Sequence, residues 1–161
     1  MNTAEYNKCV NNYADGVYRF IQKNLGDREK SRDIVQESFS RLWEKAEEVS
    51  FEKAKTYLFT TAYHTMIDMI RKDKRNTSIE DQHLNLQVSF NKYNDLQEIL
   101  NRALDTLPEI QRNVITLRDY EGYSYEEIGK ITGLSESQVK VYIYRGRLAL
   151  KNYIGSIEKV I

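Results

Sequence analysis

The chain has 161 residues, of which 40% are hydrophobic, so it can form one ordinary domain or two small ones with a packed core. Its 24 basic and 24 acidic residues cancel, so overall charge gives no argument for a nucleic-acid partner. The single cysteine excludes an internal disulfide and a multi-cysteine zinc site, and the two histidines stand in no metal-ligand spacing. We therefore expect no metal and no cofactor. We also expect a cytoplasmic protein, because the N-terminus lacks a signal pattern and no apolar run reaches membrane-spanning length.

The first part of the chain has two segments of helical periodicity. From Tyr6 to Ile21 apolar residues recur every three or four positions, and Gly26 follows where a C-terminal cap belongs. Asp27 can cap a second helix, which has an apolar stripe from Ile34 to Ala46 and an outer face rich in Asp and Glu. Such a face is either simply solvated or a surface for a partner.

A third helical segment, Lys53 to Arg75, is apolar around most of its circumference and ends in a basic cluster. A helix of this kind is normally buried. Aromatic side chains beside cations also hold unstacked bases, at about 1–3 kcal/mol per stacked base. For Tyr57, Phe59 and Tyr63 we favour core packing, with base contacts as the alternative.

Periodicity is lost between residues 76 and 93, which are mostly polar. We interpret this stretch as a flexible linker between a domain at 1–75 and a domain at 94–161. Fully extended, it would span roughly 60 Å at about 3.3 Å per residue. A linker of this length could join domains that bind several helical turns apart on DNA.

Two further helices are expected after the linker. Asn94 is a suitable cap for the first, and Pro108, the only proline, can open the second at its first position.

The next stretch has the pattern of a helix-turn-helix. Ser124 and Glu127 form a capping box, Gly133 ends the helix that follows, and Ser135 with Gln138 repeats the capping arrangement at once. Two helices joined by so short a turn must cross steeply. The residues predicted to face the first helix from the second are Val139, Ile143, Gly146 and Leu150.

The opposite face of the second helix is basic, and no acidic residue occurs from Ser137 to Ile157. Such a helix could enter the major groove of DNA. A solvated basic face on a structural hairpin is the alternative. The face carries Lys140, Tyr144, Arg145, Arg147 and Lys151.

Because no strand-like alternation persists, we predict an all-α protein made of two small helical domains. An enzyme is disfavoured, since the chain has no phosphate-binding glycine-rich loop, zinc-ligand cluster or nucleophile motif. Two rival functions stay open at this point. One is a helix-turn-helix regulator that binds operator DNA as a dimer, although its usual α/β receiver would show buried strands where helices are predicted here. The other is an adaptor that binds only proteins.

The order of these motifs resembles that of bacterial sigma factors of the sigma-70 family, in the extracytoplasmic-function (ECF) group. Residues 33–39, Asp-Ile-Val-Gln-Glu-Ser-Phe, with Leu42-Trp43, resemble the family's polymerase-binding helix. Residues 57–68 with Arg71-Lys72 resemble its promoter-melting helix. The segments that resemble the family's C-terminal domain are Leu107-Pro108, Gln111-Arg112, Leu117-Arg118, Glu121-Gly122, residues 124–128 and Val139-Lys140.

The resemblance implies a factor that binds core RNA polymerase and directs it to promoter DNA, without covalent chemistry of its own. In the family, contacts are made with the clamp helices of the largest subunit and the flap of the second largest, and an anti-sigma factor is a common further partner. The implied core-binding residues are Asp33, Gln36 and Glu37. The implied −10 contacts are Phe51, Tyr57, His64, Asp68, Arg71 and Lys72. For the −35 element, Lys140, Val141, Tyr144 and Arg145 would face the bases or the groove, and Arg118, Ser124, Tyr125 and Arg147 would hold phosphates.

The chain departs from the family pattern at two positions. His64 stands where many members carry Asn beside the captured base, which puts the base preference in doubt. Gly129 replaces a usual Ala in the first helix of the helix-turn-helix, at a cost of about 0.5–1 kcal/mol in helix stability.

Overall fold

A computed structural model describes residues 1–76 and 95–158, and these residues form helices and no strand. The predicted linker at 76–93 and the predicted cap Asn94 lie, except for residue 76, outside the described residues. The all-α prediction is confirmed. The N-terminal elements are α1 (Thr3–Leu25), α2 (Arg28–Glu44), the 3-10 turn η1 (Phe51–Lys53) and α3 (Ala54–Asn76).

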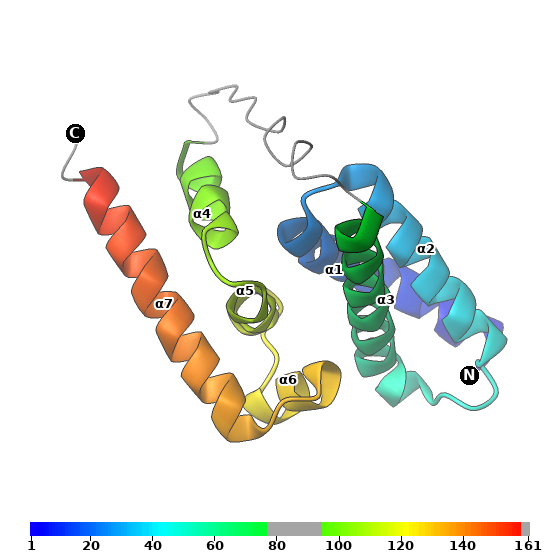
Figure 1. The fold of residues 1–161 in the computed structure, drawn as a ribbon. Coiled ribbons are helices and arrows are strands. Elements are labelled where there is room, and N and C mark those ends of the chain that lie inside the picture. Colours follow the sequence, from blue (N-terminus) through cyan, green and yellow to red (C-terminus); the bar gives the residue numbers. More distant parts are fainter. Residues whose placement is uncertain (77–94, 159–161) are drawn as a thin grey trace.

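The C-terminal part begins with α4 (Asp95–Asp105) and α5 (Glu109–Ile115), and a π-helical turn, η4 (Thr116–Tyr120), continues α5. The helix-turn-helix then consists of α6 (Tyr125–Thr132) and α7 (Glu136–Glu158). In Figure 1, α1, α2 and α3 form one group of helices, and α7 runs along the far edge of the other group.

Local signals in the sequence account for several helix ends. Gly26 (φ 78°) and Gly133 (φ 80°) are left-handed and end α1 and α6 as predicted. Asp27 caps α2 by accepting a hydrogen bond from the backbone N–H of Lys30 at 3.1 Å. The capping box of Ser124 and Glu127 is also present at the start of α6.

The N-terminal helices enclose an apolar core. Phe20 of α1, Ile34 and Leu42 of α2, and Leu58 of α3 are fully buried. Their burial follows the predicted stripes, because residues three and four apart lie on one face of a helix.

Half of the inner face of α7 packs on a different neighbour from the predicted one. Val139 and Ile143 are buried in the same core cluster as Ile128 and Ile131 of α6. Gly146 instead lies against Ile115 of α5, and Leu150 packs on the small cluster of Leu104, Leu107 and Ile115. The prediction that Gly146 and Leu150 face α6 is therefore wrong. The physical reason is that α6 is only 8 residues long. It therefore covers only the first part of α7, and the later part packs on other helices.

Gly146 is required by this close packing, which gives a test of the C-terminal core. A Cβ atom there would lie 2.2 Å from Ile115 Cδ1. We expect Gly146→Ala to lower the free energy of unfolding by about 1–2 kcal/mol, because overpacking outweighs the gain in helix propensity. The same change in an Ile115→Val background should cost much less, since that background lacks Cδ1.

Urea unfolding of the four proteins of this double-mutant cycle measures the coupling. Gly155→Ala is the matched control, because it lies in the same helix and its Cβ would meet nothing within 4 Å. It should be neutral or slightly stabilising. Equal effects of Gly146→Ala in both backgrounds would contradict the close contact.

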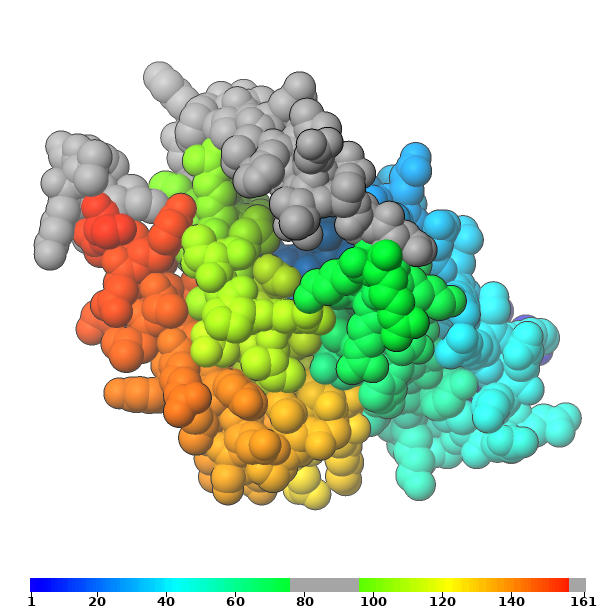
Figure 2. Space-filling view, in the orientation of Figure 1, coloured from blue at the N-terminus to red at the C-terminus, as the bar shows by residue number. Residues whose placement is uncertain are grey.

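The two groups of helices touch directly. A single core cluster contains Phe20 and Phe59 from α1 and α3 together with Tyr123 and Ile128 from the C-terminal part. The space-filling view shows the atoms of α6 directly against those of α3 (Figure 2). The described parts on either side of residues 77–94 are thus packed together.

Candidate nucleic-acid and polymerase interfaces

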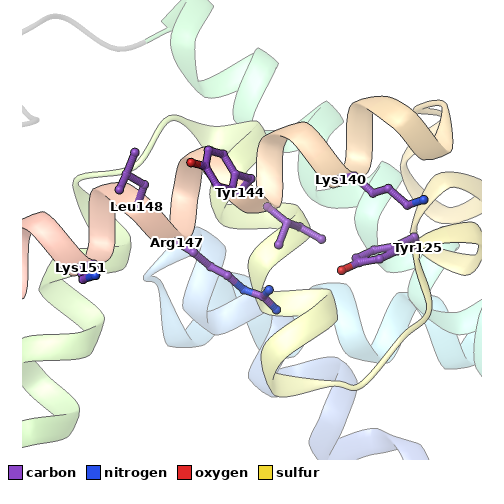
Figure 3. Close-up of a pocket in the computed structure, with 7 residues that line it drawn as sticks. Tyr125, Lys140, Tyr144, Arg147, Leu148 and Lys151 are labelled. Atoms are coloured by element: carbon purple, nitrogen blue, oxygen red, sulfur yellow. The ribbon is translucent and has the colours of Figure 1, made fainter.

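A shallow hollow lies along the outer face of α7, beside the start of α6 (Figure 3). The hollow combines cationic and apolar side chains, and Tyr144 on its wall is 70% exposed. Its lining residues are Tyr125, Lys140, Ile143, Tyr144, Arg147, Leu148 and Lys151. Because the basic side chains of Lys140, Arg147 and Lys151 are exposed, the surface can meet a phosphate backbone and the edges of bases.

Neighbouring side chains fix the orientation of this surface. The guanidinium of Arg118 donates a hydrogen bond to the Tyr123 carbonyl at 2.9 Å and lies 4.5 Å from the centroid of the Tyr125 ring. The ammonium of Lys140 lies 5.6 Å from the same centroid. Two cations therefore hold the Tyr125 ring at the mouth of the hollow.

Arg147 is held by an acidic partner. Its guanidinium donates to both carboxylate oxygens of Asp119, with Nε 3.1 Å from Oδ2. This hydrogen bonding raises the pKa of Arg147. A bidentate pair fixes the plane of the guanidinium, so its remaining N–H groups have a defined direction.

The structure brings Tyr125, Lys140, Tyr144 and Arg147 together around one hollow, and their contacts with DNA stay a prediction. Val141 and Arg145 are exposed on α7 but do not line the hollow. The hydroxyl of Ser124 accepts from the backbone N–H of Glu127 at 3.2 Å and donates to its carboxylate at 2.8 Å. Ser124 is thus a helix cap, and its role as a phosphate contact stays a prediction.

Sequence reasoning missed two contributors to this surface, Leu148 and Asp119. Leu148 lies one helical turn after Tyr144, so the spacing of the predicted face could have found it. Asp119 is 28 residues from Arg147, and no local pattern connects the two.

Helix α3 carries a polar stripe, which is a second candidate surface. Tyr57, His64 and Arg71 are spaced seven residues apart, which places them on one side of the helix. His64, Asp68, Arg71 and Lys72 are exposed, whereas Phe51 and Tyr57 are half-buried. The His64 ring meets the edge of Tyr63 at a centroid distance of 5.4 Å.

Two of the three aromatic residues of α3 belong to the core. Phe59 is 1% exposed and Tyr63 is 7% exposed, which confirms the core-packing interpretation for both. Burial raises the pKa of the Tyr63 phenol, as expected for an ionisable group taken out of water. Tyr57 lies between the core and the exposed stripe.

The outer face of α2 forms an acidic ridge, defined here as the exposed residues Asp33, Gln36 and Glu37. Glu37 pairs with Arg41 one turn later at 2.6 Å. Trp43 on the same helix is 52% exposed and touches the Tyr6 ring edge-on at 4.9 Å. An exposed tryptophan beside charged side chains is typical of a protein-binding surface. The sequence analysis placed Trp43 in the apolar stripe of this helix and in the motif that resembles the polymerase-binding helix, and its exposure shows that it is not part of the buried stripe.

Within residues 1–76 and 95–158, no group of three or more His, Cys, Asp or Glu side chains is arranged to hold a metal ion. The described helices include none that is long and apolar enough to cross a membrane.

Comparison with protein families defines the class of protein. The family model "Sigma-70 region 2" matches residues 9–76, and "Sigma-70, region 4" matches residues 97–150. The fold and the exposed surfaces thus belong to a DNA-binding factor of transcription initiation, built from a region 2 and a region 4.

Individual relatives agree with this class. The ECF sigma factor SigX of Bacillus subtilis is 30% identical over 157 residues, which covers 88% of this chain and 79% of that protein. SigM of the same organism is 29% identical over 86% of this chain and 88% of its own length. The sigma factor RpoE of Bartonella quintana, solved in complex with the anti-sigma factor NepR, shares the fold, with a TM-score of 0.81 at 23% identity over 95% of this chain and 98% of that chain.

The chain belongs to the ECF group of the sigma-70 family. It is a sigma factor, which directs promoter-specific transcription, and the alternative of a dimeric operator-binding regulator is not favoured.

Proposed function

We propose that three exposed surfaces of this sigma factor each bind a different part of the transcription initiation complex. The acidic ridge of α2 binds the clamp helices of core RNA polymerase, the polar stripe of α3 binds the −10 element, and the basic hollow of α7 binds the −35 element. The observation that carries the proposal is that these surfaces lie on three different helices and are accessible at the same time. The functional units are residues 1–75 and 94–161, joined through 76–93.

The mechanism requires no covalent chemistry, so the protein is not an enzyme. Unstacking a base from duplex DNA costs a few kcal/mol. Stacking a flipped base on an aromatic ring returns about 1–3 kcal/mol. His64 provides an exposed ring and Tyr57 a half-buried one on the same side of α3, and Arg71 and Lys72 provide charge for the adjacent phosphates.

At the −35 element, Arg118, Tyr125 and Arg147 position the duplex, and Lys140 and Tyr144 enter the groove. Phosphate contacts set register, whereas contacts to base edges carry sequence information. With no net charge on the whole chain, the polymerase supplies much of the nonspecific DNA affinity.

The protein acts in the cytoplasm, where RNA polymerase and promoters are found. An anti-sigma factor is a further partner. Support comes from two solved structures of similar fold, the sigma factor RpoE with the anti-sigma factor NepR and CnrH with the cytosolic domain of CnrY, at TM-scores of 0.81 and 0.73.

Run-off transcription with bacterial core polymerase and a library of genomic promoter fragments tests the function. We expect a set of transcripts that appears only when the purified chain is added. Transcripts that are independent of the chain would contradict the proposal.

His64 gives a narrower test of the −10 surface. His64→Asn should change the order of preference among the four bases at the captured position, because Asn and His present different hydrogen-bonding groups. Affinity of the holoenzyme for single-stranded −10 oligonucleotides with each base measures this. Core binding should be unchanged, and an identical order of preference in both proteins would remove His64 from the base pocket.

A further inference from the structure

A hollow of about 280 Å³ lies between the later part of α3 and the start of α5. The side of the hollow on α3 includes Tyr63, Ile67, Arg71 and Lys74, which follow one another at three- and four-residue spacing and so share one face of the helix. Tyr63 and Arg71 are eight positions apart, which is about 12 Å along the helix at about 1.5 Å per residue. The hollow is therefore elongated, and its two ends differ in chemistry.

The inner end of the hollow is polar and buried. Asn113 of α5 is 1% exposed and Tyr63 is 7% exposed, and a hydrogen bond joins their side chains. Among the described residues, Asn113 Oδ1 has no hydrogen-bond partner. The bond between the two side chains therefore runs from the amide nitrogen to the phenol oxygen. It leaves one acceptor, Asn113 Oδ1, and one donor, the O–H of Tyr63.

This donor and acceptor form a recognition edge. Burial raises the pKa of the Tyr63 phenol, and the hydrogen bond from Asn113 offsets only part of this effect, so the O–H is kept at neutral pH. The opposite orientation of the Asn113 amide would also leave one donor and one acceptor. A buried acceptor without a partner is costly, so a bound group that supplies a donor would relieve it. Each nucleobase presents a donor beside an acceptor on one edge.

The walls between the two ends are apolar. Ile67 and Ile70 line the hollow from α3, and Ile110 lines it from α5. All three are only partly buried, so apolar surface is left that the flat faces of a base could cover. Apolar walls with a few converging polar groups are the usual anatomy of a small-molecule site.

The outer end of the hollow is charged. Arg71 and Lys74 of α3 and Glu109 of α5 line it, and these two cations and one carboxylate leave one net positive charge. Lys74 Nζ lies 4.0 Å from Glu109 Oε2, which is a long ion pair, and the Lys74 side chain is 69% exposed. Lys74 is therefore accessible to an anion. Arginine and lysine bind phosphate, whereas a carboxylate accepts hydrogen bonds from ribose hydroxyls.

We propose that the hollow between α3 and α5 is a binding site for a ribonucleotide. The edge of its base meets Tyr63 and Asn113. Its ribose hydroxyl meets Glu109, and its phosphate lies between Arg71 and Lys74. The site requires neither polymerase nor DNA, so it goes beyond the proposed function and can be measured on the chain by itself.

Isothermal titration calorimetry of the full chain with AMP, GMP, CMP and UMP tests the site. We expect at least one of the four to bind with a dissociation constant of about 1 mM or lower. The matching nucleoside should bind at least about tenfold more weakly, because it has no phosphate for the two cations. Failure of all four nucleotides to bind would overturn the proposal, and a water molecule would then be the partner of Asn113 Oδ1.

The sugar distinguishes a free ribonucleotide from a nucleotide of DNA. The matching 2′-deoxynucleotide should bind the unchanged chain more weakly, because it lacks the hydroxyl that donates to Glu109. Glu109→Ala should remove this difference. If the unchanged chain bound the deoxynucleotide as tightly as the ribonucleotide, or more tightly, the assignment to a ribonucleotide would be wrong.

Lys74→Gln tests the phosphate end. It should weaken binding of the nucleotide severalfold and leave binding of the nucleoside unchanged. Arg75→Gln is the matched control, because it removes the same charge one position later, from an exposed residue that does not line the hollow. The control should bind the nucleotide like the unchanged chain. Equal losses in the two variants would show that bulk charge, and not the hollow, attracts the nucleotide.

Asn113→Leu separates binding from folding at the inner end. We expect the nucleotide to bind at least about tenfold more weakly, because the acceptor is lost. The midpoint of urea unfolding should stay the same or rise, since an unpaired buried acceptor is removed. Tyr63→Phe keeps the ring and removes only the O–H, so it should also weaken binding. Full affinity in Tyr63→Phe would overturn the base contact, even if Asn113→Leu did not fold.

Discussion

Replacement of both Asp33 and Glu37 by arginine should weaken binding to core RNA polymerase by about 30-fold or more. The two carboxylates are exposed on α2, next to Gln36 and on the helix that also exposes Trp43. Loss of one partner of a buried, hydrogen-bonded charge pair at an interface costs about 2–5 kcal/mol, and about 2 kcal/mol is about 30-fold in affinity. The double change also adds repulsion against any basic partner surface. Fluorescence anisotropy of the labelled chain titrated with core enzyme measures the loss.

The control carries the same change in charge at another place. Glu47 and Glu48 are exposed just after α2, so Glu47→Arg with Glu48→Arg alters the net charge equally. This variant should bind core within a few-fold of the unchanged chain. If both double variants lost affinity equally, bulk charge rather than the ridge would determine binding. Circular dichroism should show unchanged helix content in each.

Arg145→Ala and Arg147→Ala should affect promoter recognition in different ways. Arg145 is exposed and does not line the hollow, so we expect its side chain to reach a base edge. Its loss should therefore reduce discrimination between −35 sequences by about 1–3 kcal/mol. Arg147 is oriented by Asp119, and its loss should weaken binding to all sequences alike. Competition footprinting with reconstituted holoenzyme on a set of −35 variants measures both effects.

Asp119→Asn extends this comparison. It keeps the size of the side chain but removes the charge that orients Arg147, so its effect should resemble that of Arg147→Ala in kind and be smaller. The assignment of these two residues would be reversed if holoenzyme footprints showed that Arg147→Ala changes sequence preference and Arg145→Ala does not.

The helices and the helix-turn-helix could be predicted because their signals are local. Gly26, Asp27 and Gly133 act through bonds to backbone groups a few residues away, and their effects are visible in any short window of sequence. The exposed faces of α2 and α7 were predicted for the same reason, since helical spacing places their residues without knowledge of the neighbours.

The packing of α7 could not be predicted in this way. Spacing shows that Gly146 and Leu150 share the inner face with Val139, but it does not say which helix covers each part of that face. The short length of α6 and the position of Ile115 decide it.

By itself, the sequence determined the all-α fold, the caps of its helices and the basic face of α7. Only the tertiary structure decided that region 4 rests on region 2. The contact of Arg19 with Glu121 joins residues 102 positions apart, and that of Asn24 with Thr116 joins residues 92 apart. Such pairs leave no periodic trace along the chain, because their geometry depends on how two separately folded groups of helices meet.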